Sequence, residues 1–245
     1  MQNAPSRHLP VDGTFNIRDL GGYAAGDNHT RWRRVFRADG LHRINSAGMD
    51  QLIAEGVATV IDLRQPNELV SQPNPFSANT RVAYHNVSLF EQLAPVPKSD
   101  TDVLFDLYTT ALAQRQEAIA EVLTIIADAP DGAVLFHCTA GKDRTGIISA
   151  LLLAVAGVEA ALIVEDYALT GNLIAPMVEQ IIADATARGA DEASFRRLLA
   201  SDPATMAATI DHIEATYGSA SMYLETIGLA PTSIDRLRNR LLGDV

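Results

Sequence analysis

An apolar run that leads through a glycine-containing loop into a long apolar segment constrains the fold of this 245-residue chain most strongly. Residues 133–136 form a short apolar run, which is typical of strands buried on both faces of a sheet. They lead through HCTAGKDRTG at 137–146 into apolar residues as far as 158, too few to span a bilayer. A loop between a strand and a helix N-terminus directs backbone N–H groups inward and forms a site for anions. We therefore expect a buried strand, an anion-binding loop and a core helix.

Other segments extend this pattern to a whole sheet. Nearly continuous β-branched stretches predict strands, and apolar residues at helical spacing predict helices. The expected strands are 34–37, 57–64, 82–89 and 133–137, and the expected helices before the loop are 46–55, capped by Asn45 or Ser46, and 102–127. Because strands alternate with helices, we predict the α/β class, with a central, mainly parallel sheet flanked by helices. Ligands bind beyond the carboxyl ends of such strands, where the loop begins.

The last third of the chain is predicted to be almost entirely helical. The expected helices are 158–169, 174–188, 191–200, 204–217, 219–227 and 232–242, and Gly171 separates the first two. Asp202 is a suitable helix cap, and Pro203 suits the first turn. We expect residues 1–12 to be a flexible N-terminal tail and residues 13–245 to form a single domain.

Composition excludes several classes of partner. The formal net charge of −11 argues against nucleic acid, whose binding needs a broad basic face, and against tight adhesion to anionic membranes. We expect no stable membrane insertion. A single cysteine excludes a disulfide within the chain. The N-terminus carries no signal-peptide pattern, so a cytoplasmic location is the default expectation, with secretion without a cleaved leader left open.

Within the loop, Cys138 and Arg144 are the candidate catalytic pair. Five residues separate them, so one compact turn can bring the sulfur beneath an oxyanion whose edge the guanidinium holds. A free cysteine has a pKa of about 8.5, and helix N-termini and nearby cations lower that value, so we expect a nucleophilic thiolate. These parts suit in-line phosphoryl transfer through a phosphocysteine, with charge stabilisation from loop amides and Arg144. We expect neither a metal nor another cofactor.

The other loop residues are candidates for phosphate binding. Gly141 lets the backbone turn without a side chain in the way of the anion, Thr145 could hydrogen-bond the sulfur, and His137 could orient the loop through backbone hydrogen bonds. The predicted phosphate-binding set is His137, Thr139, Ala140, Gly141, Lys142, Thr145 and Gly146. A lone cysteine after an apolar strand is usually a small buried hydrophobe. The histidine, glycine, arginine and Thr-Gly around this one favour catalysis.

The loop matches the signature His-Cys-x5-Arg-Ser/Thr-Gly of cysteine-dependent tyrosine phosphatases. The wider chain resembles the bacterial tyrosine phosphatase family that includes the secreted phosphatases of mycobacteria and Listeria. The stretches that carry the resemblance are 15–23, 36–39, 60–64 with Glu68, 166–167 and 223–229. It covers about residues 13–242 and implies a phosphatase-type α/β fold, with Cys138 as nucleophile and Arg144 as phosphate clamp.

The general acid is open on sequence grounds. The Trp-Pro-Asp tripeptide of many tyrosine phosphatases is absent, and the resemblance implies that Asp143 is the acid. A carboxyl group beside the leaving oxygen can protonate it, although Lys142 and Arg144 favour its ionised form. The alternative is that Asp143 only braces the loop, with Arg64 as a partner. The reserve candidates are Glu91, Asp106 and Asp166.

Three residues are predicted to support the loop. Asp62 and Arg64 lie at the expected carboxyl end of a central strand, and Asp166 could contact the loop from behind. For Arg64 a surface ion pair is the alternative.

Substrate and partners follow from charge and from the resemblance. Lys142 is a second loop cation that favours highly charged phosphates, and the resemblance implies action on phosphoproteins and phosphoinositides. The basic run at 31–37 is either a rim for an anionic surface or a solvated strand. We expect a phosphorylated protein or a phosphoinositide as substrate, with phosphate or vanadate as an active-site anion.

Two other functions and one structural device stay open. A rhodanese-like sulfurtransferase also places a thiolate in such a loop, but the Arg-Thr-Gly at 144–146 disfavours it. A non-catalytic phosphate-binding module would be expected to lose Cys138. Residues 172–217 exceed a minimal phosphatase core, and the resemblance implies a helical lid there, with an ordinary helical subdomain as the alternative.

Overall fold

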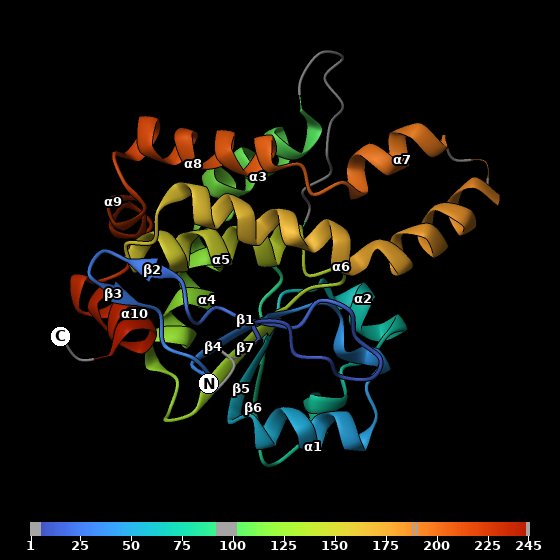
Figure 1. Ribbon diagram of the computed structural model, residues 1–245, viewed down its shortest axis with the longest axis horizontal. Coiled ribbons are helices and arrows are strands. Elements are labelled where there is room, and N and C mark those ends of the chain that lie inside the picture. Colours follow the sequence, from blue (N-terminus) through green and yellow to red (C-terminus); the bar gives the residue numbers. More distant parts are fainter. Residues whose placement is uncertain (1–5, 92–101, 188, 190, 244–245) are drawn as a thin grey trace.

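A five-stranded sheet forms the centre of the protein (Figure 1). The computed structural model describes residues 6–91, 102–187, 189 and 191–243. The strands lie in the order β1-β4-β7-β5-β6, and all are parallel except β1, which is antiparallel to β4. Their bounds are β1 (Arg18–Asp19), β4 (Val35–Ala38), β5 (Val57–Asp62), β6 (Ala83–Asn86) and β7 (Ala133–His137). The predicted mainly parallel α/β sheet is confirmed, with β5 and β6 ending earlier than predicted.

Helices make up most of the rest of the described chain. They are α1 (Ser46–Ala54), α2 (Pro66–Ser71), α3 (Val103–Gln114), α4 (Gln116–Asp128), α5 (Asp143–Val155), α6 (Ala160–Ala187), α7 (Glu192–Leu199), α8 (Pro203–Tyr217), α9 (Ala220–Thr226) and α10 (Pro231–Leu242), with short 3-10 helices η1 (Leu41–Arg43) and η2 (Pro75–Ala78). The side chain of Asn45 caps α1 by accepting a hydrogen bond from the Gly48 N–H. Asp202 caps α8 in the same way, with Pro203 in the first turn. Both caps lie where the sequence predicts them.

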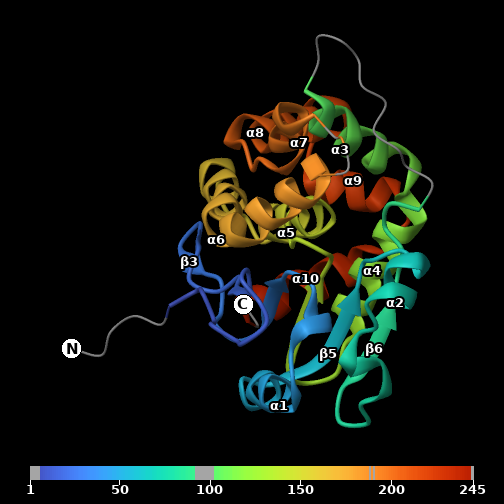
Figure 2. The ribbon, with the colours of Figure 1, turned by 90° about the vertical axis from the view of Figure 1, so that its right-hand side faces the viewer.

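The sheet separates two apolar cores, and β7 contributes to both. Val134 and Phe136 pack into the larger core with α3 to α6 and α8 to α10. Ala133 and Leu135 alternate with them and pack into the smaller core with η1 and α1. Figure 2 shows α1 on one side of the sheet and α5 and α6 on the other. Because β7 is buried on both faces, its C-terminal end holds the following loop on rigid support.

Two predicted helix boundaries are wrong. The helix predicted over 102–127 is two helices, α3 and α4, because Arg115 leaves helical geometry and its guanidinium donates to the carbonyls of Ser88 and Leu89. The break predicted at Gly171 does not occur, and α6 runs through both Gly171 and Pro176. An isolated glycine costs a helix only about 1 kcal/mol, and here Ser201 packs 3.6 Å from the position of its missing Cβ.

The predicted flexible tail is wrong for residues 6–12. Leu9 N–H donates to Ile17 O, Asp19 N–H donates to Arg7 O, and Val11 is buried in the smaller core. The guanidinium of Arg7 also lies over the ring of Tyr23. This segment therefore packs as part of the domain, and residues 1–5 lie outside the described part of the chain. The hairpin β2 (Ala24–Ala25) and β3 (Asn28–His29) follows.

Among the described residues, α6 contains one stretch, Ala160–Ala183, that by length and composition alone is apolar enough to cross a membrane. It is longer than the stretch 146–158 that the sequence analysis singled out. A core helix of a soluble protein meets the same criterion. Ile163, Tyr167 and Ile174 of α6 are buried, the first two in the larger core.

Candidate active site

The loop 138–142 joins the C-terminal end of β7 to the N-terminus of α5. Cys138 is the first loop residue and is only 3% exposed. Gly141 has a φ of +66°, and a Cβ there would lie 2.6 Å from the carbonyl oxygen of Ala38. Only glycine fits this close approach of two backbones without strain. The predicted strand, loop and helix are therefore all present, with the sulfur at the carboxyl end of a central strand.

Residues in and beside β1 and β4 donate hydrogen bonds to the loop carbonyls. Gly40 N–H donates to Thr139 O at 2.9 Å, and Asn16 Nδ2 donates to Ala140 O at 3.0 Å. Arg37 donates to Gly141 O at 2.7 Å. Because these carbonyls face protein donors, the loop N–H groups are left to converge on its centre beside the α5 N-terminus, which favours a bound anion. Asn16 and Arg37 were not predicted as site residues, although both lie in stretches that carry the family resemblance.

Arg144 lies in the first turn of α5 and is held by Glu68 of α2. The two guanidinium nitrogens donate to the two carboxylate oxygens at 2.6 and 3.0 Å, and one of them also donates to Thr139 Oγ1 at 3.1 Å. Burial opposes ionisation of Glu68, but its hydrogen bonds and the charge of Arg144 lower its pKa to about 2. Burial also acts on Arg144, but the charges of Cys138 and Glu68 raise its pKa above the usual value. The planar guanidinium of Arg144 is thus held in place as a cation beside the loop.

His137 is fully buried and orients the loop from below. Its Nδ1 lies 2.9 Å from Cys138 O, and its Nε2 lies 3.2 Å from Asp62 Oδ2 and 2.8 Å from Asn74 Nδ2. Asp62 is itself held by two hydrogen bonds from the Arg64 side chain, at 2.9 and 2.7 Å. Burial raises the pKa of Asp62, but His137, Arg64 and Asn74 outweigh it and keep that pKa well below its usual range.

The alternatives left open for Arg64 are wrong. Its side chain is fully buried, which excludes a surface ion pair, and its carboxylate partner is Asp62 instead of Asp143. Asn74 was not predicted, because it belongs to a turn with no apolar or catalytic pattern.

Asp166 of α6 contacts the loop indirectly. It is fully buried, and it pairs with Arg37 and with Arg18 and accepts a hydrogen bond from Tyr23 at 2.9 Å. Burial opposes ionisation, but the two arginines lower the pKa of Asp166 to about 2. A carboxylate that stays ionised beneath the loop cannot serve as the reserve acid. Instead it orients Arg37, which holds Gly141 O.

Asp143 lies at the start of α5 and keeps about a quarter of its side chain exposed. Its Oδ1 accepts a hydrogen bond from Tyr108 OH at 2.6 Å and lies 3.2 Å from Lys142 Nζ. Tyr108 comes from α3, within the segment 102–127 that was predicted only as helix. No local pattern indicates a role for its hydroxyl, because periodicity identifies the buried face of a helix and not the polar atom at its edge.

Lys142 is not directed at the phosphate position. Its ammonium donates to the carbonyls of Leu198 and Ala200, the latter at 3.0 Å, and the side chain is only 1% exposed. The last carbonyls of a helix lack intrahelical partners and attract cations. The end of α7 therefore holds this lysine, contrary to the prediction that it sits beside the substrate.

Thr145 also differs from the prediction. Its hydroxyl is buried and has no hydrogen-bond partner among the described residues, so the predicted bond to the sulfur is absent. Gly146 faces Tyr167, whose ring would lie 3.1 Å from a Cβ at that position. Gly146 therefore provides space for a neighbouring helix instead of a phosphate contact.

The basic run at 31–37 does not form a rim of the site. Arg37 is buried under the loop, and the exposed Arg33 pairs with Glu55. The run 31–37 precedes and then forms β4. Only the C-terminal end of β4 reaches the loop, because Ala38 there pairs with His137. Arg37 therefore belongs neither to a rim nor to a solvated strand, and both interpretations of the run are wrong at this residue.

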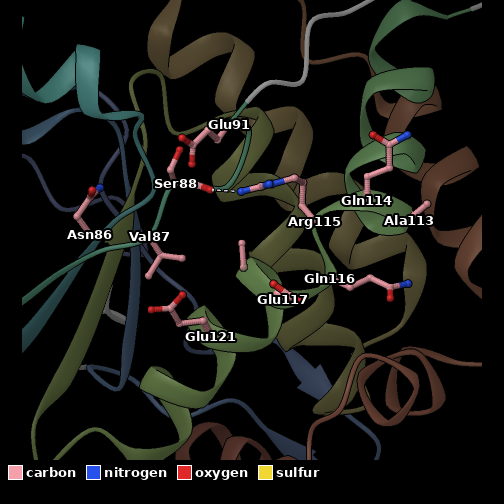
Figure 3. Close-up of a pocket in the computed structure, with 11 residues that line it drawn as sticks. Asn86, Val87, Ser88, Glu91, Ala113, Gln114, Arg115, Gln116, Glu117 and Glu121 are labelled. Carbon is pink, nitrogen blue, oxygen red and sulfur yellow. Dashed lines mark hydrogen bonds between the residues drawn. The ribbon is translucent and has the colours of Figure 1, made fainter.

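A cavity of about 520 Å³ lies between the chain after β6 and the junction of α3 with α4 (Figure 3). Glu91, Glu117 and Glu121 line it, and none of its lining residues belongs to the loop 137–146. Arg115 there is engaged with the carbonyls of Ser88 and Leu89. Three carboxylates repel a phosphate, so this cavity is not the anion site, and Glu91 is a poor candidate for the acid.

The arrangement around Cys138 defines a cysteine-dependent phosphatase, in which a thiolate and an arginine share one anion-binding loop. Sequence comparison agrees, since a profile described as the tyrosine phosphatase family matches residues 9–243. A tyrosine-protein phosphatase of Nostoc commune is 36% identical over 218 residues, which span 84% of this chain and 73% of that protein. This chain therefore belongs to the tyrosine phosphatase family.

The chain is also similar to two further proteins. The triple specificity protein phosphatase PtpB of Mycobacterium tuberculosis is 29% identical over 281 residues, which span 97% of this chain and 99% of that protein. Among solved structures, TpbA of P. aeruginosa in complex with phosphotyrosine has a TM-score of 0.42 at 18% identity, and the match covers 81% of this chain and 98% of that one.

Proposed function

We propose that this protein is a metal-independent phosphatase that hydrolyses phosphotyrosine through a phosphocysteine on Cys138. The observation that carries the proposal is the loop geometry. Three consecutive loop carbonyls accept hydrogen bonds from Gly40, Asn16 and Arg37, and the loop runs from Cys138 to the N-terminus of α5. The loop N–H groups are thereby left to stabilise the charge that develops on a transferring phosphoryl group.

In the first step the Cys138 sulfur attacks phosphorus, and the bond from phosphorus to the tyrosyl oxygen breaks. Arg144, already fixed by Glu68, holds two equatorial oxygens through its planar fork. Asp143 gives its proton to the departing oxygen, which leaves as a neutral phenol. The products of this step are phosphocysteine, the phenol and an ionised Asp143.

In the second step a water molecule attacks phosphorus from the side that the phenol has left. Asp143 accepts a proton from that water, the sulfur–phosphorus bond breaks, and Cys138 leaves as a thiolate.

For the substrate, we propose a phosphoprotein ahead of a phosphoinositide. The net charge of −11 disfavours an anionic membrane surface, and the second loop cation, Lys142, is engaged by α7. A relative carries the name triple specificity protein phosphatase, and breadth to phosphoserine, phosphothreonine and phosphoinositides is the second candidate. Phosphate and vanadate are the proposed active-site anions.

We propose a lid that is smaller than the predicted segment 172–217. Met206, Ile210 and Ile213 of α8 belong to the larger core, so α8 is part of the domain body. The proposed cover is therefore the part of α6 after residue 171 together with the whole of α7. The Lys142 ammonium joins the end of α7 to the loop. Limited proteolysis with and without vanadate tests this proposal, since equal cleavage of α7 in both states would count against a substrate-gated cover.

Hydrolysis of p-nitrophenyl phosphate in EDTA, with and without vanadate, tests the chemistry. We expect turnover that survives EDTA, inhibition by vanadate, and no turnover by Cys138→Ser, which should still bind phosphate. Turnover by Cys138→Ser, or loss of wild-type activity in EDTA, would overturn the proposal. A phosphotyrosyl peptide, its phosphoseryl counterpart and vesicles with a phosphoinositide, compared by kcat/KM, then rank the substrate classes.

A further inference from the structure

We propose that Tyr108, backed by Tyr167, is a positioning residue that decides which oxygen of Asp143 carries the proton for the leaving group. This inference rests on the proposed role of Asp143 as the general acid. The two tyrosines come from different helices, α3 and α6, and neither belongs to the loop signature. They form a chain of two hydroxyls that ends on the carboxylate.

The geometry of the chain is tight and buried. Tyr108 OH lies 2.6 Å from Asp143 Oδ1 and 2.7 Å from Tyr167 OH. Tyr108 is fully buried and Tyr167 is 1% exposed. The two rings meet edge to face at 84°, with centroids 6.2 Å apart, an arrangement that aromatic pairs prefer.

The direction of each hydrogen bond follows from the acceptor at the end of the chain. An ionised carboxylate has no hydrogen to donate, so Tyr108 must donate to Asp143 Oδ1. The oxygen of Tyr108 is then free to accept, and Tyr167 donates to it. Lys142 Nζ lies 3.2 Å from the same Oδ1. Donors therefore occupy Oδ1, and a proton that arrives on Asp143 settles on Oδ2.

This arrangement holds in both protonation states of the acid. When Oδ2 carries the proton, Oδ1 is the carbonyl oxygen of the carboxylic acid and still accepts from Tyr108. The hydrogen bond thus need not rearrange during turnover, and Asp143 keeps the same oxygen available in both steps. A fixed donor of this kind supports proton transfer because the acid must lie within hydrogen-bond reach of the departing oxygen.

The tyrosines remain donors throughout the working pH range. Burial, and then the nearby Asp143 carboxylate, raise the pKa of Tyr108 well above its usual value. Burial and Asp143 likewise raise the pKa of Tyr167. Neither phenol loses its proton at a pH where the enzyme would act.

Close packing prevents the chain from swinging away. The Tyr167 ring lies 3.1 Å from the position that a Cβ on Gly146 would occupy. Glycine in the first turn of α5 therefore lets α6 bring this ring against the loop helix. A larger residue at 146 would displace Tyr167, and through it Tyr108.

The test compares Tyr108→Phe with Tyr223→Phe, a matched control. Tyr223 is also fully buried, and its hydroxyl donates to Leu112 O of the same helix α3 at 2.8 Å, so its loss removes one buried hydrogen bond away from the acid. For each variant and for Asp143→Asn, kcat is measured across pH with p-nitrophenyl phosphate and with phenyl phosphate. Phenol is the poorer leaving group and depends more on protonation.

For Tyr108→Phe we expect the ratio of the phenyl phosphate rate to the p-nitrophenyl phosphate rate to fall about tenfold, which is only part of the roughly 10²–10⁴-fold that a positioned acid contributes. Tyr223→Phe should keep the wild-type ratio. If Asp143→Asn lowers the ratio but Tyr108→Phe behaves like Tyr223→Phe, the tyrosine proposal fails alone. If Asp143→Asn leaves the ratio unchanged, the acid assignment fails first.

Discussion

Replacement of Gly141 by alanine tests whether the loop is as closely enclosed as its geometry implies. The backbone there has a φ of +66°, and a Cβ would lie 2.6 Å from the Ala38 carbonyl oxygen and 2.8 Å from Asn16 Nδ2. The left-handed conformation costs a non-glycine residue about 1–2 kcal/mol. The contact with Ala38 adds a further cost, because a backbone carbonyl cannot rotate away as a flexible side chain can. The loop or β4 must shift.

Gly26→Ala separates these two costs. Gly26 lies in the turn between β2 and β3 with a φ of +59°, close to that of Gly141, and, its chain neighbours aside, no heavy atom of the described residues lies within 4 Å of the position its Cβ would take. This control therefore carries the conformational cost without the clash. We expect it to lower the free energy of unfolding by about 1–2 kcal/mol and to leave kcat/KM unchanged.

Gly141→Ala should lose more stability than Gly26→Ala and should also lose activity. A displacement of about 1 Å at a catalytic site can cost about 10²-fold in rate, so we expect kcat/KM for p-nitrophenyl phosphate to fall about 100-fold or more. Urea denaturation gives the stability of both variants, and vanadate titration reports the anion site directly. Equal stability of the two variants together with near wild-type kcat/KM for Gly141→Ala would refute the proposed enclosure.

Three further changes have defined outcomes. Glu68→Gln should weaken the fixed fork of Arg144 by about 1–2 kcal/mol, roughly 5- to 30-fold in kcat/KM, and an unchanged vanadate affinity would argue against this role. The free energy of unfolding should decrease as pH falls from about 5 towards 2. Asp62, Glu68 and Asp166 have lowered pKa values in the folded state, so in this pH range the unfolded chain binds more protons than the folded one. Urea midpoints that do not change over this range would contradict this prediction. Lys142→Met should increase protease cleavage of α7, because the ammonium holds two carbonyls at its end, whereas cleavage equal to wild type would show that the contact does not anchor the helix.

Features encoded by neighbouring residues were predictable from the sequence. The strand 133–137, its loop and α5 are contiguous, so the periodicity, the glycine and the Cys-x5-Arg spacing appear within one short window. The caps at Asn45 and Asp202 depend on the same kind of local signal. The break at Arg115 was missed because its cause, the carbonyls of Ser88 and Leu89, lies more than 25 residues earlier.

Asp62, Arg64 and Asp166 were predicted as supports of the loop, but the residues that hold its carbonyls were not. Asn16 reaches a carbonyl 124 residues later, and Arg37 reaches one 104 residues later. Whether a polar side chain in a strand faces solvent or a buried acceptor depends on which strand lies beside it. The strand order β1-β4-β7-β5-β6 cannot be predicted from any short stretch of sequence. Cys138, Arg144 and the supports Asp62, Arg64 and Asp166 could therefore be proposed from the sequence, whereas Asn16 and Arg37 could not.

The two loop cations illustrate the same limit and connect it to substrate choice. Lys142 and Arg144 lie two residues apart, and by sequence both should face the phosphate. Glu68 fixes Arg144 as a fork beside the loop, whereas the carbonyls of Leu198 and Ala200 hold Lys142 towards α7. A second phosphate on the substrate can gain Lys142 only if these two carbonyls release it. Preference for multiply charged substrates thus depends on α7 as much as on the loop, and Lys142→Met should reduce turnover of a phosphoinositide relative to a phosphotyrosyl peptide only if α7 opens during catalysis.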